Sequence, residues 1–209
     1  MSLTETLRHY LGQCPLVAII RGVTPDEAEA IGEAIYQGGI RIIEVPLNSP
    51  DPFASIERLA AKFGEQILLG AGTVLRWSEI HDVKAAGGRL VVSPNTNAEV
   101  IAATADAGLV SCPGYFTPSE AFAALEAGAT ALKLFPAEGA APAVLKAQRA
   151  VLPKDVPVLI VGGIAPDNMA PWLAAGASGF GLGGGLYQPG QTAEQTLEKA
   201  RAYVAGVQS

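Results

Sequence analysis

The sequence has few cysteines and few histidines, which limits the chemistry that it can support. Its two cysteines, Cys14 and Cys112, are not in C-x-x-C spacing, so we expect buried, reduced thiols and no disulfide framework. Its two histidines, His9 and His81, fall in segments that we expect to be helical. No HxH or HExxH spacing and no carboxylate cluster is present. The sequence therefore predicts no bound metal, no other cofactor and no serine–histidine–aspartate site.

Charged residues are also scarce, at 16% of the chain, and they form no basic run. The formal net charge is −6 and both signs are scattered, which argues against a nucleic-acid partner. The N-terminal segment carries Glu5 and Arg8 where a signal peptide would need an apolar run. No apolar window approaches the roughly 20 residues needed to cross a bilayer. We therefore expect a cytoplasmic protein with small-molecule partners, without nucleic acid or membrane.

The sequence instead contains one pattern repeated eight times. Short apolar runs alternate with amphipathic segments, as expected for buried parallel strands separated by helices. The runs cover residues 16–22, 41–47, 67–74, 89–95, 109–115, 131–137, 157–163 and 179–187. Eight such units predict an α/β protein, a single (β/α)8 TIM barrel over residues 1–209, with a doubly wound open sheet as the alternative. Residues 1–13 predict an extra helix that covers the N-terminal end of the barrel.

Helix boundaries are also visible in the sequence. Residues 24–27 (TPDE) and 117–120 (TPSE) combine an N-cap threonine, a proline at the first helical position and a capping glutamate. Residues 165–168 (APDN) are a weaker version of the same helix start. Glycines that precede the next strand predict left-handed caps at the helix ends. These glycines are Gly38, Gly39, Gly64, Gly87, Gly88, Gly108, Gly128 and Gly176.

Two charged side chains interrupt the apolar faces of the predicted strands. Alternate strand residues face opposite ways, which turns Glu44 and Lys133 toward the barrel interior. They form either an ion pair that merely fills the barrel or a catalytic site. A desolvated lysine has a lowered pKa, and its neutral amine can attack a ketone to form an iminium, an electron sink for carbon–carbon cleavage. Glu44, the only inward-facing acid of the predicted strands, is the candidate for moving protons.

Glycine-rich segments at the ends of predicted strands seven and eight indicate a phosphate site. Gly162 and Gly163 end strand seven, and residues 181–185 (GLGGG) lie in and after strand eight. Loops after these two strands often hold phosphate in such barrels, through backbone N–H groups. Arg21, at the end of strand one, is a candidate to hold a carboxylate or phosphate, and Thr73 a candidate to hydrogen-bond a carboxylate. The alternatives are that Arg21 is a surface arginine and that Thr73 is merely a polar residue at a strand end.

Six motifs resemble the 2-keto-3-deoxy-6-phosphogluconate/6-phosphogalactonate aldolase family in order and spacing. They are residues 44–49 (EVPLNS), 70–74 (GAGTV), 93–95 (SPN), 112–114 (CPG), 133–137 (KLFPA) and 161–164 (VGGI), and they span nearly the whole chain. The resemblance implies a (β/α)8 barrel and a class I, Schiff-base aldolase that needs no metal and forms a homotrimer. It implies that Lys133 is the Schiff-base lysine and Glu44 the general acid/base.

The resemblance also implies roles for residues around this pair. Thr73 and Arg21 would contact the pyruvyl carboxylate, and Pro94 and Phe135 would shape the pocket around the pyruvyl methyl group. The residues that would line the phosphate end are Val161, Gly162, Gly163, Gly183 and Gly184. The expected partners are therefore pyruvate and a phosphorylated sugar acid.

Two departures from the phosphogluconate branch favour the phosphogalactonate branch. Asn48 stands where the phosphogluconate branch has a substrate-holding arginine, with Arg21 closing strand one instead, and Val161 stands where threonine is usual. We therefore expect cleavage of 2-dehydro-3-deoxy-6-phosphogalactonate into pyruvate and D-glyceraldehyde 3-phosphate, with the gluconate epimer as the alternative. Gly184 replaces a serine found in many members, which removes a hydroxyl contact to phosphate and raises the question of unphosphorylated substrates.

Two other functions fit a phosphate-binding barrel. A metal-dependent sugar-phosphate epimerase would need histidines at the strand ends, which the sequence lacks. A non-catalytic sugar-phosphate sensor would have no use for Glu44 and Lys133 together. The aldolase is therefore the function that the sequence favours.

Overall fold

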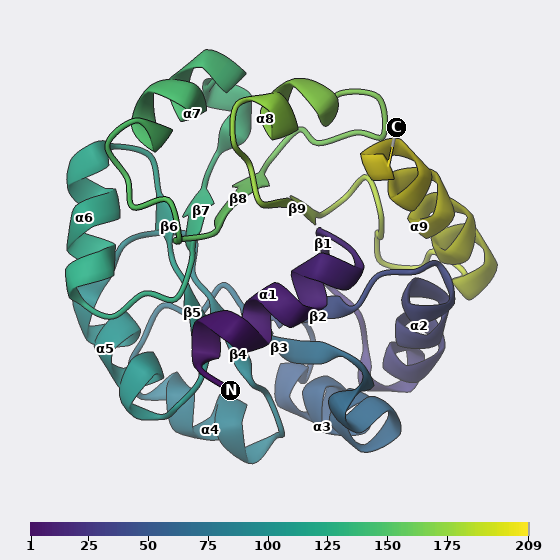
Figure 1. Cartoon of the computed structure of the whole chain (residues 1–209). Coiled ribbons are helices and arrows are strands. Elements are labelled where there is room, and N and C mark those ends of the chain that lie inside the picture. Colours follow the sequence, from purple (N-terminus) through teal and green to yellow (C-terminus); the bar gives the residue numbers. More distant parts are fainter. Residues whose placement is uncertain (209) are drawn as a thin grey trace.

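The computed structural model describes residues 1–208 as a ring of parallel strands surrounded by helices (Figure 1). The strands are β1 (Leu16–Ile19), β2 (Ile42–Pro46), β3 (Leu68–Gly72), β4 (Leu90–Val92), β5 (Val110–Cys112), β6 (Gly114–Tyr115), β7 (Leu132–Leu134), β8 (Val158–Val161) and β9 (Gly179–Leu182). They pair in the order β5-β4-β3-β2-β1-β9-β8-β7-β6, and every pair is parallel. β5 and β6 are one extended segment interrupted at Pro113, so the two ends of this order meet. The predicted TIM barrel is confirmed.

Helices surround the strands, and all the long helices except α1 form the outer layer of the barrel, as Figure 1 shows. The helices are α1 (Leu3–Gln13), α2 (Pro25–Gln37), α3 (Pro52–Phe63), η1 (Gly64–Gln66), α4 (Glu79–Ala85), α5 (Ala98–Asp106), α6 (Pro118–Glu126), η2 (Ala137–Gly139), α7 (Pro142–Arg149), α8 (Ala170–Ala174) and α9 (Ala193–Gln208). The outward strand residues Ile43, Val45, Leu132 and Leu134 are fully buried beneath this layer. Within residues 1–208, no helix has both the length and the apolar character needed to cross a membrane.

Most of the predicted helix boundaries agree with the structure, but one helix start and two of the predicted left-handed caps do not. Gly38 has a φ of −71°, and Gly88 also lacks a positive φ. α2 and α6 begin at Pro25 and Pro118 with capping boxes, and Gly39, Gly87, Gly108, Gly128 and Gly176 adopt positive φ at helix ends. The helix start predicted at residues 165–168 is wrong, because α8 begins only at Ala170. The Asn168 side chain accepts from the Ala165 N–H at 3.0 Å and donates to the Gly163 carbonyl at 2.8 Å. These bonds hold the segment as a turn.

The strands are shorter than the apolar runs that predicted them. The last run, residues 179–187, is extended only as far as Leu182. The N–H groups of Leu186 and Tyr187 both donate to the Gly183 carbonyl, at 2.9 and 3.1 Å, and so form a turn. Apolar character alone did not distinguish strand from turn, because Leu186 and Tyr187 of the turn are as buried as the strand residues, although Gly184 and Gly185 before them are exposed.

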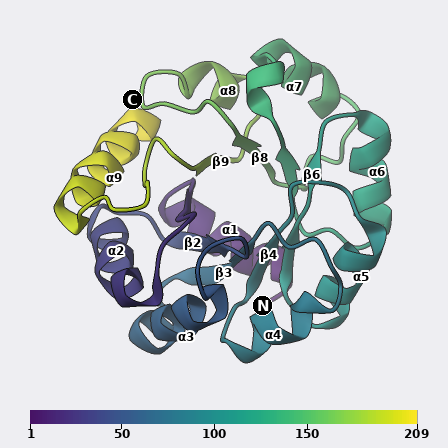
Figure 2. The ribbon, with the colours of Figure 1, turned by 180° about the vertical axis from the view of Figure 1, so that it is seen from behind.

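The first helix, α1, lies across one end of the barrel (Figure 1). Its apolar residues Leu7, Tyr10 and Leu11 pack in one cluster with barrel residues such as Val17 and Ile42. Figure 2 views the barrel from the opposite end. This opposite end carries the loops that follow the strands.

Candidate active site

A cavity of about 580 Å³ opens where the strands end, and it gathers every site residue that the sequence predicted. These residues are Arg21, Glu44, Thr73, Pro94, Lys133, Phe135, Val161, Gly162, Gly163, Gly183 and Gly184. They come from seven of the strands or the loops directly after them, as catalytic residues of TIM barrels do. Within residues 1–208, no group of three or more His, Cys, Asp or Glu side chains is placed to hold a metal ion.

Glu44, in the middle of β2, has the most unusual environment of these residues. Its side chain is 2% exposed, and its Oε2 atom has no hydrogen-bond partner. Burial raises the pKa of its carboxyl group to about 7, although the positive charges of Lys133 and Arg21 act to lower it. A carboxyl group that titrates near neutral pH can both donate and accept a proton, as a general acid/base must.

Lys133 projects from β7 into the same cavity and is 7% exposed. Burial lowers the pKa of its amine, and the charge of Glu44 opposes this shift. The Nζ atom lies 4.6 Å from the centroid of the Phe135 ring. Among the described residues, Lys133 and Glu44 form no ion pair within 4.0 Å. The pair is therefore not a contact ion pair that fills the barrel.

The end of strand one is held by a small hydrogen-bond network. Arg21 donates through one terminal nitrogen to the Asn48 side-chain oxygen, and through the other to Thr73 Oγ1 at 3.2 Å. Thr73 has a φ of 55°, an uncommon conformation for a β-branched residue that costs about 1–3 kcal/mol. Such strain is typical of functional sites. Asn48 therefore orients Arg21. In the sequence, Asn48 was named only as a departure from the phosphogluconate branch, and this contact was not predicted.

The glycines form the other end of the cavity. Gly162 and Gly163 have φ values of 113° and 65°, which side-chain-bearing residues rarely adopt. The Tyr203 hydroxyl donates to the Ile164 carbonyl at 2.9 Å, and a Cβ atom added at Gly185 would overlap this hydroxyl. Tyr203, on α9, thus joins the loop after β8 to the turn after β9.

Five residues that line the cavity were not predicted as site residues: Ile19, Glu138, Ile164, Ala165 and Tyr203. Ile19 lies on β1, where its apolar side chain gave no chemical signal. Glu138 follows the KLFPA motif directly, so its place beside the motif was the available signal. Tyr203 is a single aromatic residue on the last helix, and nothing in the local sequence connects it with the glycine segments.

The space for the Glu44 carboxylate depends on Gly72, the last residue of β3. A Cβ atom added at Gly72 would overlap both carboxylate oxygens of Glu44. We expect Gly72→Ala to displace Glu44, to lower kcat, and to destabilise the protein by about 1–3 kcal/mol, the usual cost of overpacking a core. Activity assays and urea unfolding measure these two effects.

Gly12→Ala is the matched control for Gly72→Ala. Gly12 lies in α1, and a Cβ atom added there meets no heavy atom within 4 Å. We expect this variant to keep full activity and to gain up to about 1 kcal/mol of stability from helix propensity. Full activity of Gly72→Ala would show that the Glu44 carboxylate does not depend on the space beside Gly72.

The chain is similar to known aldolases in sequence and in fold. A curated relative named 2-dehydro-3-deoxy-6-phosphogalactonate aldolase, from Escherichia coli strain K12, is 46% identical over 190 residues, which cover 91% of this chain and 93% of the relative. The solved native KDPGal structure superposes with a TM-score of 0.92 at 45% identity, over 94% of this chain and 95% of that one.

A more distant solved structure is informative about chemistry. It is the KDPG aldolase of Legionella pneumophila with pyruvate captured as a covalent carbinolamine intermediate, at a TM-score of 0.83 and 30% identity, over 94% of this chain and 97% of that one. The model of the KDPG and KHG aldolase family matches residues 7–200. The chain therefore belongs to the KDPG and KHG aldolase family.

Proposed function

We propose that this protein is a class I aldolase that cleaves 2-dehydro-3-deoxy-6-phosphogalactonate into pyruvate and D-glyceraldehyde 3-phosphate. One observation carries the proposal. A buried lysine with a lowered pKa shares a cavity with a buried carboxyl group of pKa about 7, and the two make no ion pair within 4.0 Å. A substrate carbonyl held between them meets a nucleophile and a proton carrier.

The reaction begins at Lys133. Its neutral amine attacks the C2 ketone to give a carbinolamine, and protonated Glu44 supplies a proton so that water leaves and an iminium forms. The Glu44 carboxylate then takes the proton of the C4 hydroxyl. The C3–C4 bond breaks, its electron pair moves to the iminium, and the aldehyde leaves. Protonation of the resulting enamine at C3 and hydrolysis release pyruvate and restore Lys133.

The two ends of the cavity fit the two charged ends of this substrate. Arg21 and Thr73 supply donors for the C1 carboxylate, with Asn48 holding the guanidinium. The glycine end, formed by Gly162, Gly163 and the turn after β9, offers backbone without Cβ atoms to the phosphate. Pro94 and Phe135 line the same cavity, where they would contact the pyruvyl methyl group.

The galactonate epimer is the preferred substrate in this proposal. The E. coli relative carries that name, and Val161 and Asn48 depart from the phosphogluconate pattern at the cavity wall and at Arg21. Parallel measurement of kcat/KM for the two C4 epimers tests the choice. A clear preference for the gluconate epimer would mean that the gluconate epimer is the substrate, and the proposed mechanism would stay the same.

Borohydride reduction in the presence of pyruvate tests the mechanism itself. We expect mass spectrometry to find one stable pyruvyl adduct, on the peptide that contains Lys133. The exposed Lys146 on α7 is an internal comparison in the same digest. An adduct on Lys146, or no adduct, would refute the Schiff-base mechanism.

Gly184→Ser tests the phosphate end. A Cβ atom at Gly184 would meet nothing closer than Gln188 Nε2 at 3.9 Å, so a serine fits there. Its hydroxyl adds a hydrogen bond to a charged group, and we expect KM for the phosphorylated substrate to fall by about three- to tenfold. Steady-state kinetics with phosphorylated and unphosphorylated substrate measure this change.

Gly185→Ser provides the contrast to Gly184→Ser. A side chain at Gly185 would overlap the Tyr203 hydroxyl, so we expect this variant to weaken phosphate binding. Equal effects of both variants, or an improvement with the unphosphorylated substrate alone, would contradict a phosphate at this end.

The homotrimer and the cytoplasmic location stay predictions that come with the family resemblance and the sequence. Trp77 and Leu75, in the loop after β3, are 62% and 48% exposed. This apolar surface suits a contact between copies of the chain.

A further inference from the structure

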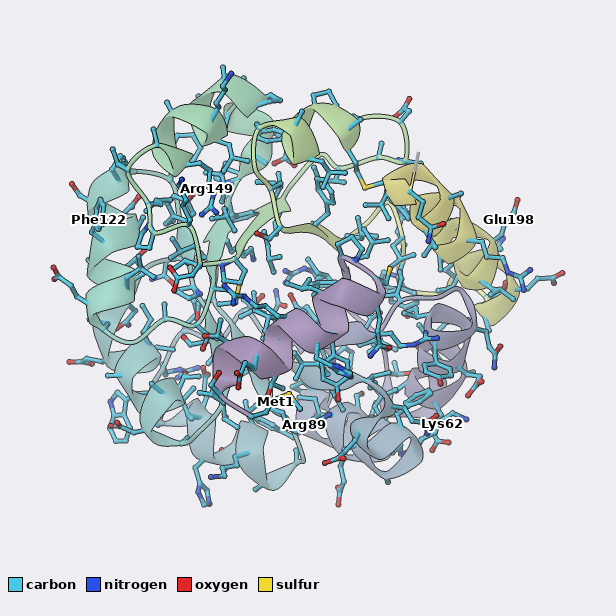
Figure 3. All side chains as sticks on the ribbon, viewed as in Figure 1. Met1, Lys62, Arg89, Phe122, Arg149 and Glu198 are labelled. Atoms are coloured by element: carbon cyan, nitrogen blue, oxygen red, sulfur yellow. The ribbon has the colours of Figure 1, made fainter. Side chains whose placement is uncertain are left out.

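Tyr203, on the last helix, reaches the glycine end of the cavity from the outer layer of the barrel. Helix α9 presents its outer face to solvent, where Glu198 points away from the barrel (Figure 3), and it buries Thr196, Ala200 and Tyr203. Tyr203 is 4% exposed, and its side chain lines the cavity. This phenol takes part in no step of the proposed mechanism, although it lies in the site.

The Tyr203 hydroxyl lies between the two loops that form the glycine end. It donates to the Ile164 carbonyl, in the loop after β8, at 2.9 Å. A Cβ atom added at Gly185, in the turn after β9, would lie 2.2 Å from the same hydroxyl oxygen, so the turn packs directly on it. Helix α9 contacts the loop after β8 a second time, because a Cβ atom added at Gly206 would lie 2.2 Å from the Pro166 carbonyl oxygen. A single hydroxyl group on a packed helix thus contacts both loops.

Backbone N–H groups in both loops are available to a ligand. Those of Gly163, Gly184 and Gly185 donate to no acceptor among residues 1–208. Successive free N–H groups bind an anionic oxygen, and hydrogen bonds to a charged acceptor are stronger than those to a neutral one. Two loops can bind one anion together only if their relative position is fixed, so the contact between the loops affects the affinity.

We propose that Tyr203 is a positioning residue for the phosphate end of the substrate. Its hydroxyl holds the loop after β8 against the turn after β9, so that N–H groups from both meet the phosphate oxygens without prior rearrangement. The inference rests on the proposed function. It adds to that function a residue, far away in the sequence, that sets the preference for phosphorylated over unphosphorylated sugar acids.

Tyr203→Phe tests this role because it removes the hydroxyl and keeps the ring. The Ile164 carbonyl then loses its donor, and the two loops are free to move apart. We expect KM for the phosphorylated substrate to rise by about five- to twentyfold, the usual effect of an unpaired buried acceptor, with kcat unchanged within about twofold. For the unphosphorylated acid, both values should stay within about twofold of the wild type, because that substrate places no phosphate between the loops.

Calorimetric titration with inorganic phosphate measures the same loss without turnover. We expect the Kd for inorganic phosphate to rise by about five- to twentyfold in Tyr203→Phe, for the same reason as KM. Borohydride trapping of pyruvate on Lys133 should be unaffected, since pyruvate carries no phosphate. A residue that only supported the fold would not separate these measurements.

Tyr10→Phe is the matched control. The Tyr10 hydroxyl also donates to a backbone carbonyl, that of Glu65, at 2.7 Å, and Tyr10 is 5% exposed. Tyr10 lies on α1, which crosses the end of the barrel opposite to the cavity (Figure 1). We expect this variant to lose a similar amount of stability in urea unfolding, and to change neither the KM values nor the Kd for inorganic phosphate.

The decisive value is the ratio of kcat/KM for the two substrates, measured on one preparation. A partly unfolded sample lowers both values alike and leaves this ratio unchanged. An unchanged ratio in Tyr203→Phe, or an unchanged Kd for inorganic phosphate, would overturn the role of Tyr203. If the wild type still traps pyruvate on Lys133, only that role is refuted, whereas a wild type that traps no pyruvate refutes the proposed function itself.

Discussion

Replacing Lys133 with methionine is expected to abolish turnover, by at least about 10⁴-fold, while the barrel stays folded. Methionine has nearly the volume of lysine but no amine, so the iminium cannot form. Lys133 is 7% exposed, and replacing its buried polar amine with an apolar group relieves a desolvation cost, so the free energy of unfolding should not fall. We would measure kcat/KM, borohydride trapping with pyruvate, and urea unfolding on the same preparation.

Lys146→Met is the matched control for this variant. Lys146 is exposed on α7, and its loss should leave activity and trapping unchanged. If Lys133→Met kept an activity within about tenfold of the wild type, another group would have to form the covalent intermediate. If Lys133→Met lost activity because it unfolded, Lys133→Arg would be measured instead. Arginine keeps a positive charge at this position but cannot form a Schiff base, so we expect this variant to be inactive as well.

Replacing Glu44 with glutamine is expected to have opposite effects on activity and stability. Glutamine carries no titrating proton, so kcat should fall by about 10²–10⁴-fold, the usual contribution of general acid/base catalysis. Glutamine also needs no ionisation in a buried site. The variant should therefore be more stable than the wild type at alkaline pH, although less active.

The sign of this stability effect follows from proton binding. The pKa of Glu44 is about 7 in the folded protein and 4.5 in the unfolded reference, so the folded state binds more protons between these values. Stability of the wild type therefore falls as the pH rises through this window, by about 3 kcal/mol in total. Glu44→Gln should exceed the wild type by up to about 3 kcal/mol at pH 8 and by less than about 1 kcal/mol at pH 5.

Urea unfolding at these two pH values measures the difference. Glu198→Gln, a change on the outer surface of α9, should show no comparable pH-dependent gain. A Glu44→Gln variant that is equally stable as the wild type at pH 8 would mean that the carboxylate is solvated or paired. A general acid/base of pKa near 7 at this position would then be untenable.

The position of the proposed catalytic pair, Glu44 and Lys133, could be predicted because strand periodicity is a local property. Residues two apart on a strand share a face, so the aliphatic residues around Glu44 and Lys133 indicated which way both charges point. A different local pattern, the helix-capping sequence, failed at residues 165–168, where a helix start was predicted and a turn was found. There the Asn168 side chain binds the backbone of Gly163 and Ala165, and such competition is not visible in a helix-start pattern.

The sequence by itself determined the barrel, the inward-facing lysine and acid, and the glycines at the ends of strands seven and eight. Only the tertiary structure placed Asn48 on Arg21, Tyr203 on Ile164, and Glu138 on Gly162. The first set depends on alternation along single strands and on residue types within a few positions. The second depends on which loops meet when parallel strands close into a ring, and that is fixed by strand register and helix packing over the whole chain.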